Sequence, residues 1–174
     1  MFSVSLQGTY IVFEDKYILV INKPSSLVVH PAAGNWSGTL LNGILHHLPS
    51  SKTLPRAGIV HRLDKNTTGL MVVAKDELSQ QHLVRQLQSK KVKREYRAIV
   101  WGQVWKNKTI SQPIGRHPRV RVKMAVNKIN GKDSITHYEV LERFGMNSYL
   151  RCNLETGRTH QIRVHMEFNE SPIV

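Results

Sequence analysis

A polar segment that runs directly into a short apolar strand constrains the fold of this chain more than any other feature. Residues 61–69 hold one carboxylate, Asp64, among cations and turn-forming residues, and residues 70–74 are continuously apolar. A short apolar run bounded by turn residues is typical of a buried strand. We therefore predict a polar loop at residues 61–69 that is supported by a rigid strand.

Hydrophobic periodicity predicts the remaining elements. Strands are predicted at residues 10–13, 17–21, 70–74, 95–101, 134–142 and 148–154. Helices are predicted at residues 40–48, 76–88 and 161–166, and residues 50–60, with their Ser, Lys, Pro and Gly, are predicted to be a loop. Short turns between successive strands favour antiparallel pairing. We therefore predict an α+β fold with a largely antiparallel mixed sheet and a few flanking helices.

Polar residues mark the predicted helix starts. Thr39 and Asp76 precede the first two helices, and their side chains can accept a hydrogen bond from a backbone N–H of the first turn. Thr156 or Thr159 can start the third helix. Pro24 is predicted to end the strand before it, because proline has no N–H to donate to a sheet.

The charge balance points to a polyanionic partner. The 174 residues contain 25 Lys and Arg against 12 Asp and Glu, a net charge of +13, which is typical of nucleic-acid-binding surfaces. An anionic membrane is the competing partner, but no stretch approaches the roughly 18 apolar residues of a membrane span. Cys152 is the single cysteine, which fits a reducing cytoplasm. Residues 1–8 lack the features of a signal peptide.

Four sequence blocks resemble a known family. They lie at residues 22–31, 61–75, 94–98 and 157–166, and the second begins His-Arg-Leu-Asp. Their content and order resemble the RluA-type RNA pseudouridine synthases. Residues 31–39 and 113–118 further resemble the branch that modifies large-subunit (23S) ribosomal RNA, the synthase D branch. The resemblance implies the pseudouridine synthase catalytic fold with a basic RNA-binding cleft. It also implies an enzyme that isomerises uridine in structured RNA and needs no cofactor.

The resemblance also implies more chain than is present here. Members of this branch usually carry an S4-like RNA-binding domain before the catalytic domain and continue with further strands after the last block. We therefore expect residues 1–174 to be one catalytic domain that lacks the S4-like domain and is truncated at its C-terminus. We expect it to be a monomer.

Asp64 is the first candidate catalytic residue. Arg62 and Lys65 flank it, and positive charge on both sides stabilises an ionised carboxylate, the form that attacks carbon or accepts a proton. The resemblance implies that Asp64 is the essential carboxylate, acting either as a nucleophile on ribose C1′ or as a base at C2′. The alternative is that Asp64 only organises a turn with Asn66 and Gly69.

Tyr96 and Arg163 are the other candidate catalytic residues. The resemblance implies that Tyr96 stacks on the flipped uracil and that Arg163 pairs with the catalytic carboxylate. From the residues alone, Tyr96 is equally an ordinary core aromatic on a strand, and Arg163 a solvated arginine on a helix. Arg62 lies two residues before Asp64, so it can fill the space left by a flipped nucleotide or clamp a phosphate.

Cationic residues and histidines form the candidate RNA interface. They are His61, Arg62, Lys65, Lys93, Arg94, Arg116, Arg119, Arg121, Lys123, Arg158 and His160. Arg119, Arg121 and Lys123 alternate, so if this segment is a β-ribbon they form one cationic edge that can follow a phosphate backbone. The alternative for these runs is a generic solvated surface.

The histidines do not predict a metal site. His46 and His47 are adjacent and diverge on a helix, and His160 and His165 are five residues apart rather than the four that converge on zinc. Two functional hypotheses therefore remain from the sequence. The first is a pseudouridine synthase, and the second is a non-catalytic RNA-binding or ribosome-assembly module that retains the fold.

Overall fold

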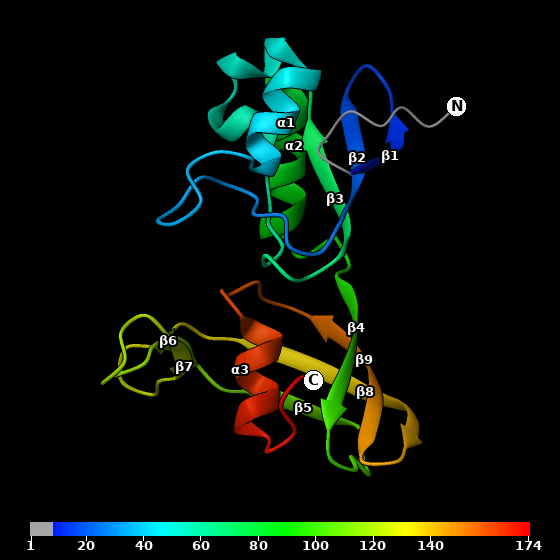
Figure 1. Ribbon diagram of the computed structural model, residues 1–174, viewed down its shortest axis with the longest axis vertical. Helices are drawn as coiled ribbons and strands as arrows, with labels where there is room; N and C mark the ends of the chain where they lie inside the picture. Colours follow the sequence, from blue (N-terminus) through cyan, green and yellow to red (C-terminus); the bar gives the residue numbers. More distant parts are fainter. Residues whose placement is uncertain (1–8) are drawn as a thin grey trace. The chain divides into compact units, whose positions relative to one another are not determined.

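The computed structural model describes residues 9–174 (Figure 1). The chain divides into two compact units, unit 1 at Met1–Ser89 and unit 2 at Lys90–Val174. The expectation that residues 1–8 are not a signal peptide concerns a segment outside the described residues. From residue 9 to residue 174, no helix is long and apolar enough to cross a membrane.

Unit 1 is a three-stranded antiparallel sheet with helices. Its strands, in the order β1-β2-β3, are β1 (Tyr10–Glu14), β2 (Ile18–Lys23) and β3 (Gly69–Ala74). Its helices are α1 (Leu40–His47), α2 (Glu77–Gln88) and two short 3-10 helices, η1 (Pro49–Thr53) and η2 (Pro55–Gly58). The strands and both α-helices confirm the predictions. The predicted loop at residues 50–60 is wrong in part, because each 3-10 helix begins at a proline whose fixed φ suits a first helical turn.

Strand alternation builds the core of unit 1. Leu19, Ile21 and Lys23 of β2 are fully buried, and Ile21 lies opposite Met71 of β3. The predicted helix caps are also confirmed. The Thr39 side chain accepts from the Asn42 N–H, and that of Asp76 accepts from Ser79. The strand that follows residues 61–68, β3, is paired with β2 along its whole length, and it begins where the polar loop ends.

Unit 2 is an antiparallel sheet with one helix and a separate hairpin. Its four-stranded sheet has the order β4-β9-β8-β5, and β6 pairs with β7. The elements are β4 (Glu95–Trp101), β5 (Lys108–Ser111), β6 (Ile114–Arg116), β7 (Met124–Val126), β8 (Ile135–Phe144), β9 (Asn147–Leu154) and α3 (Gln161–Phe168). Every pairing between named strands in the described residues is antiparallel, which confirms the predicted α+β class.

The core of unit 2 lies between its sheet and α3. Val100 of β4, Leu150 and Cys152 of β9, and Met166 of α3 are fully buried in one hydrophobic cluster. Burial raises the pKa of the Cys152 thiol to about 11, so this cysteine is an unreactive core residue. One face of α3 is therefore fixed against the sheet (Figure 1).

Residues 119–123 are not a β-ribbon, so the condition for one cationic strand edge is not met. Residues 117–123 form the loop between β6 and β7. The His117 Nδ1 atom accepts hydrogen bonds from the N–H groups of Arg119 at 3.2 Å and Val120 at 3.0 Å, which closes a turn. Pro118 has no N–H to donate to a neighbouring strand, which disfavours β pairing in this segment. Arg119, Arg121 and Lys123 are exposed on this loop rather than aligned on a strand edge.

The predicted caps of the third helix are also wrong. His160 precedes α3 in a left-handed conformation, with φ of 55°, and makes no side-chain cap. The Thr156 hydroxyl instead donates to Gln161 Oε1 at 2.8 Å and accepts from the Ile135 N–H at 3.0 Å. Thr156 therefore joins the start of α3 to β8, and α3 is fixed by contacts with the sheet rather than by a local cap.

Candidate active site and RNA interface

The Asp64 loop of unit 1 is tied to β3 at its start and folded into a turn at its centre. His61 Nε2 accepts a hydrogen bond from the Val72 N–H at 3.0 Å, and the Thr67 N–H donates to the backbone carbonyl of Asp64 at 3.1 Å. The side chain of Leu63 is buried. The turn expected around Asp64 is therefore present, and it uses the backbone of Asp64. The side chain of Asp64 is half-buried.

Lys23 lies beneath this loop. The sequence patterns did not lead us to predict it as a site residue. It is fully buried at the end of β2, and its Nζ donates to the carbonyls of Pro24 at 2.8 Å, Leu27 at 3.0 Å and Lys65 at 3.0 Å. Burial lowers the pKa of Lys23, while the nearby Asp64 charge raises it. The alternation Leu19, Ile21, Lys23 was the available signal, because it places a lysine at an inward position.

Positive side chains also surround His30 in unit 1. Burial lowers the pKa of His30, and the charges of Arg56 and Arg62 lower it further. Arg56 has φ of 54°, a left-handed conformation that costs about 1–2 kcal/mol for a residue with a side chain. A Cβ on Gly58 would overlap the Ala74 carbonyl oxygen, so only glycine lets this segment approach β3. Arg56 and Arg62 therefore both place positive charge near His30, one from η2 and one from the Asp64 loop.

In unit 2, Tyr96 lies on β4, where it is half-buried and packs against the hydrophobic cluster. Ala98 and Val100 share its face and are buried, as the alternation predicts. Arg163 is half-buried on α3. Tyr96 therefore has the core contacts of a structural aromatic.

A buried hydrogen-bonded chain fixes the helix that carries Arg163. Gln161 Nε2 donates to the Thr136 Oγ1 at 3.0 Å, and Thr136 Oγ1 lies 2.9 Å from His165 Nδ1. His165 Nε2 lies 3.0 Å from the Gln112 carbonyl. Burial lowers the pKa of His165, which favours the neutral ring. The neutral ring donates a hydrogen bond through Nε2 and accepts one from the Thr136 hydroxyl at Nδ1. Each side chain in this hydrogen-bonded series therefore has its partners.

The candidate RNA-binding residues fall into separate groups. In unit 1, His61, Arg62 and Lys65 share the Asp64 loop. In unit 2, Arg94 donates to the Glu155 carbonyl at 3.0 Å and packs against Gly157, so it holds the loop that carries Arg158. The other candidates of unit 2 are exposed: Lys93, Arg116, Arg119, Arg121, Lys123, Arg158 and His160. Among residues 9–174, no group of three His, Cys, Asp or Glu side chains is placed to hold a metal ion.

Comparison with known proteins assigns the class. Residues 17–168 match the family described as RNA pseudouridylate synthase. The chain is similar to two human proteins of known structure, RNA pseudouridylate synthase domain containing 1 and domain containing 4. The first has a TM-score of 0.78 and 27% identity, covering 100% of this chain and 70% of that one. The second has a TM-score of 0.73 and 28% identity, covering 94% and 66%. The chain belongs to the RNA pseudouridylate synthase family.

Bacterial relatives share more than half of their aligned residues with this chain. The chain is 60% identical over 163 residues to a ribosomal large subunit pseudouridine synthase D of Neisseria meningitidis serogroup B, covering 94% of this chain and 44% of that protein. It is 58% identical over 156 residues to the protein of the same name from Nitrosomonas europaea, covering 90% and 45%. It is also 54% identical over 164 residues to the protein of the same name from Escherichia coli O6:H1, and the match covers 94% of this chain and 50% of that protein. The chain thus spans about half the length of these relatives.

Proposed function

We propose that this chain isomerises uridine to pseudouridine in structured RNA, with large-subunit ribosomal RNA as its substrate class. The observation that carries the proposal is Asp64, held on an anchored loop inside the His-Arg-Leu-Asp block of this family. The names of the bacterial relatives support the choice of ribosomal RNA. Ribosomal RNA as substrate fits a cytoplasmic protein, and the proposed enzyme acts as a monomer.

The reaction rearranges one nucleotide. The bond between uracil N1 and ribose C1′ breaks, the base turns, and C5 bonds to C1′. The proton that leaves C5 is balanced by one that arrives at N1. No electrons are exchanged with another molecule, so the residues of this chain need to supply only a carboxylate, positioning and proton transfer.

Each candidate residue has a proposed role. Asp64 acts on the ribose as a nucleophile or a base, and Tyr96 stacks on the uracil and assists removal of the C5 proton. Arg163 supplies the positive charge that stabilises the carboxylate. Arg62 occupies the space of the flipped nucleotide, which offsets part of the few kcal/mol that flipping costs. The other cations of the candidate RNA interface contact phosphates.

Replacing Asp64 tests the proposal. Asp64→Asn keeps the side-chain shape and removes the carboxylate, so pseudouridine formation should fall below detection. RNA affinity should stay similar or rise slightly, because one negative charge near phosphates is lost. The measurement is mapping of modified uridines in large-subunit ribosomal RNA after incubation with the purified chain, alongside filter binding of the same RNA.

Glu77→Gln is the matched control, because it removes one exposed negative charge of unit 1 at the start of α2. This variant should modify RNA at the wild-type rate. A folded Asp64→Asn protein with substantial activity would overturn the role of the carboxylate. Wild-type chain that binds the RNA and converts no uridine would favour the non-catalytic RNA-binding module.

A further inference from the structure

Unit 2 contains a cavity beside the β6–β7 hairpin. Its volume is about 440 Å³, within the roughly 300–1,000 Å³ of typical ligand sites. Three cationic side chains line it, those of Arg116, Lys132 and Arg158, and the polar side chains of Asn130 and Thr159 complete the rim. No Asp or Glu is among its lining residues. The cavity is therefore positively charged.

Close backbone packing fixes the walls of this cavity. A Cβ on Gly131 would overlap the Asn127 carbonyl oxygen, and one on Gly115 would meet the backbone of residues 130 and 131 at 3.1–3.2 Å. The Ile114 N–H donates to the Lys132 carbonyl at 3.0 Å, and the reverse bond is 2.9 Å. The segment that carries Lys132 is thus bound directly to β6, so the charged rim is built into the fold.

Backbone contacts also position the two arginines. Arg158 Nε donates to the Asp133 carbonyl at 3.1 Å, and the Arg158 N–H donates to Gln161 Oε1 at 3.0 Å. An Arg116 guanidinium nitrogen donates to the Arg121 carbonyl at 3.3 Å. A carbonyl orients a guanidinium but does not neutralise its charge. Both arginines therefore keep a full positive charge at a defined place.

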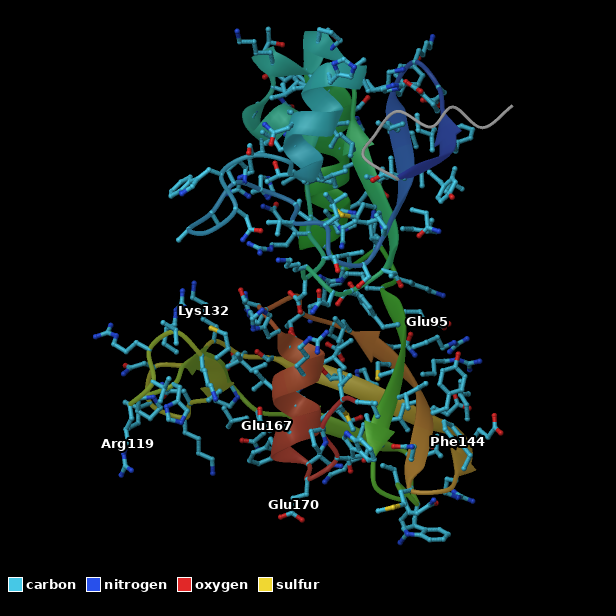
Figure 2. All side chains as sticks on the ribbon, in the orientation of Figure 1. Glu95, Arg119, Lys132, Phe144, Glu167 and Glu170 are labelled. Atoms are coloured by element: carbon cyan, nitrogen blue, oxygen red, sulfur yellow. The ribbon has the colours of Figure 1, made fainter. Side chains whose placement is uncertain are left out.

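Several ion pairs of unit 2 lie away from this cavity. Glu95, Glu139 and Glu155 form ion pairs with Lys90, Arg97, His137 and Arg151. None of these partners lines the cavity. Figure 2 shows Lys132 and Arg119 in the β6–β7 region, which carries further exposed cations. Like charges gathered without a carboxylate repel one another, and an anionic ligand removes that cost.

We propose that this cavity binds one phosphodiester group of the RNA backbone, with the adjoining ribose next to Asn130 and Thr159. This inference rests on the proposed function, which makes RNA the substrate. A phosphodiester is favoured over a stacked base because no aromatic side chain lines the cavity. The site positions RNA and reads no sequence, since phosphates are common to all nucleotides.

The dependence of RNA affinity on salt tests the site. Each neutralised phosphate contributes about 0.7–0.9 to the slope of log affinity against log salt. Lys132→Ala should lower the magnitude of that slope by about this amount, and Lys132→Arg should restore it. Lys128→Ala is the matched control, because Lys128 is exposed on the preceding turn and does not line the cavity. It should keep the wild-type slope.

Each outcome decides the proposal. A Lys132→Ala slope equal to that of the wild type overturns it, and Lys132→Gln, with folding checked by circular dichroism, guards against a misfolded variant. Inorganic phosphate, at an ionic strength matched with chloride, competes for the same cations, so it should displace RNA better than chloride does, and this difference should require Lys132. Phosphate that binds the chain in a Lys132-dependent way without displacing RNA assigns the cavity to the free ion and overturns the RNA assignment.

The same experiment separates this site from the proposed activity. A wild-type chain that forms no pseudouridine but has a Lys132-dependent slope contradicts the activity and supports the cavity. A chain that forms pseudouridine and has a slope independent of Lys132 supports the activity and overturns the cavity.

Discussion

Lys23 holds a positive charge at a position that solvent does not reach. Burying a charge is costly unless its hydrogen bonds are all made. An ammonium group has three N–H donors, and the carbonyls of Pro24, Leu27 and Lys65 accept all three. The third bond crosses 42 residues of sequence and joins the end of β2 to the loop that carries Asp64. A single side chain thus fixes the backbone immediately after the proposed catalytic residue.

Lys23→Met should therefore destabilise unit 1. The methionine fills similar space but leaves three carbonyls without their donor, and each such buried group costs about 1–3 kcal/mol. Urea unfolding at 25 °C measures the loss. Lys65→Met is the control, because its side chain is exposed and its backbone carbonyl is kept. It should change the free energy of unfolding by less than about 0.5 kcal/mol. Equal values for the two variants would contradict the structural role of Lys23.

The pH dependence of that stability has a defined sign. Burial lowers the pKa of Lys23 below the ordinary value of 10.5, so the unfolded chain binds this proton more tightly than the folded chain does. The contribution of Lys23 to stability should therefore rise as the pH increases from the lowered pKa toward 10.5. The difference between wild type and Lys23→Met isolates this contribution from other alkaline titrations.

At the scale of elements, α3 is held by the sheet beside it. Its first residue, Gln161, and its fifth, His165, both contact the hydroxyl of Thr136 on β8. Thr136 is fully buried, so its hydroxyl has no water to replace these partners. Arg163 lies between the two contacts in sequence. The orientation of that arginine consequently depends on one hydroxyl group of the neighbouring strand.

Thr136→Val tests this dependence, because valine has nearly the same shape and lacks the hydroxyl. It should lower the free energy of unfolding by about 1–3 kcal/mol and speed amide hydrogen exchange in the first turn of α3. Thr109→Val is the matched control. The Thr109 hydroxyl also contacts a histidine, His137, at 2.7 Å, but it is exposed and water can replace it. Exchange in α3 that is unchanged by Thr136→Val would show that the helix is held by its apolar face alone.

Histidine titration adds a second measurement at α3. Burial lowers the pKa of His165 below 6.5, so the unfolded chain takes up this proton first as the pH falls. Stability from the neutral ring is complete above about pH 6.5 and is lost as the pH falls toward the lowered pKa. His165→Gln should reduce that acid dependence if the ring is its source.

Local patterns predicted most elements because their causes are local. The alternation in β2 and β4, and the caps at Thr39 and Asp76, depend on residues a few positions apart. The predictions differ from the structure where a side-chain hydrogen bond, and not a local sequence pattern, determines the backbone conformation. The ring of His117 closes a loop where alternating cations allowed a strand, and Thr156 bonds to Gln161 instead of capping α3. No periodicity encodes such contacts, nor the long-range bond from Lys23.

At the scale of the whole molecule, the proposed catalytic residues come from both units. Asp64 belongs to unit 1, and Tyr96 and Arg163 belong to unit 2. The sequence could predict this set only through its family blocks, because composition and periodicity do not connect residues so far apart in the chain. The net charge of +13 likewise indicated a polyanion without indicating where it binds. A functional link between the two units is thus the strongest requirement of the proposal.

Replacing Arg163 tests that link. If the charge of Arg163 stabilises the ionised Asp64, Arg163→Met makes the ionised carboxylate less favourable, and the rate at neutral pH should fall steeply. Raising the pH should restore part of the rate, because it drives the carboxyl group back to its ionised form. Arg163→Lys should retain more activity, since it keeps the charge and loses only the two-pronged geometry. The measurement is the pH–rate profile of single-turnover pseudouridine formation.

The control for this test is Arg97→Met, on the face of β4 opposite to Tyr96. Arg97 pairs with Glu95 at 2.9 Å and is exposed, so its loss should leave both the rate and the profile at wild-type values. A general effect of removing one positive charge from unit 2 would lower the rate of both variants equally, without a shift along the pH axis. Only a charge that acts on the reacting carboxylate produces a shift confined to Arg163→Met. If that variant folds and keeps the wild-type rate and profile, Arg163 is an ordinary helix-face residue and the catalytic set reduces to Asp64 and Tyr96.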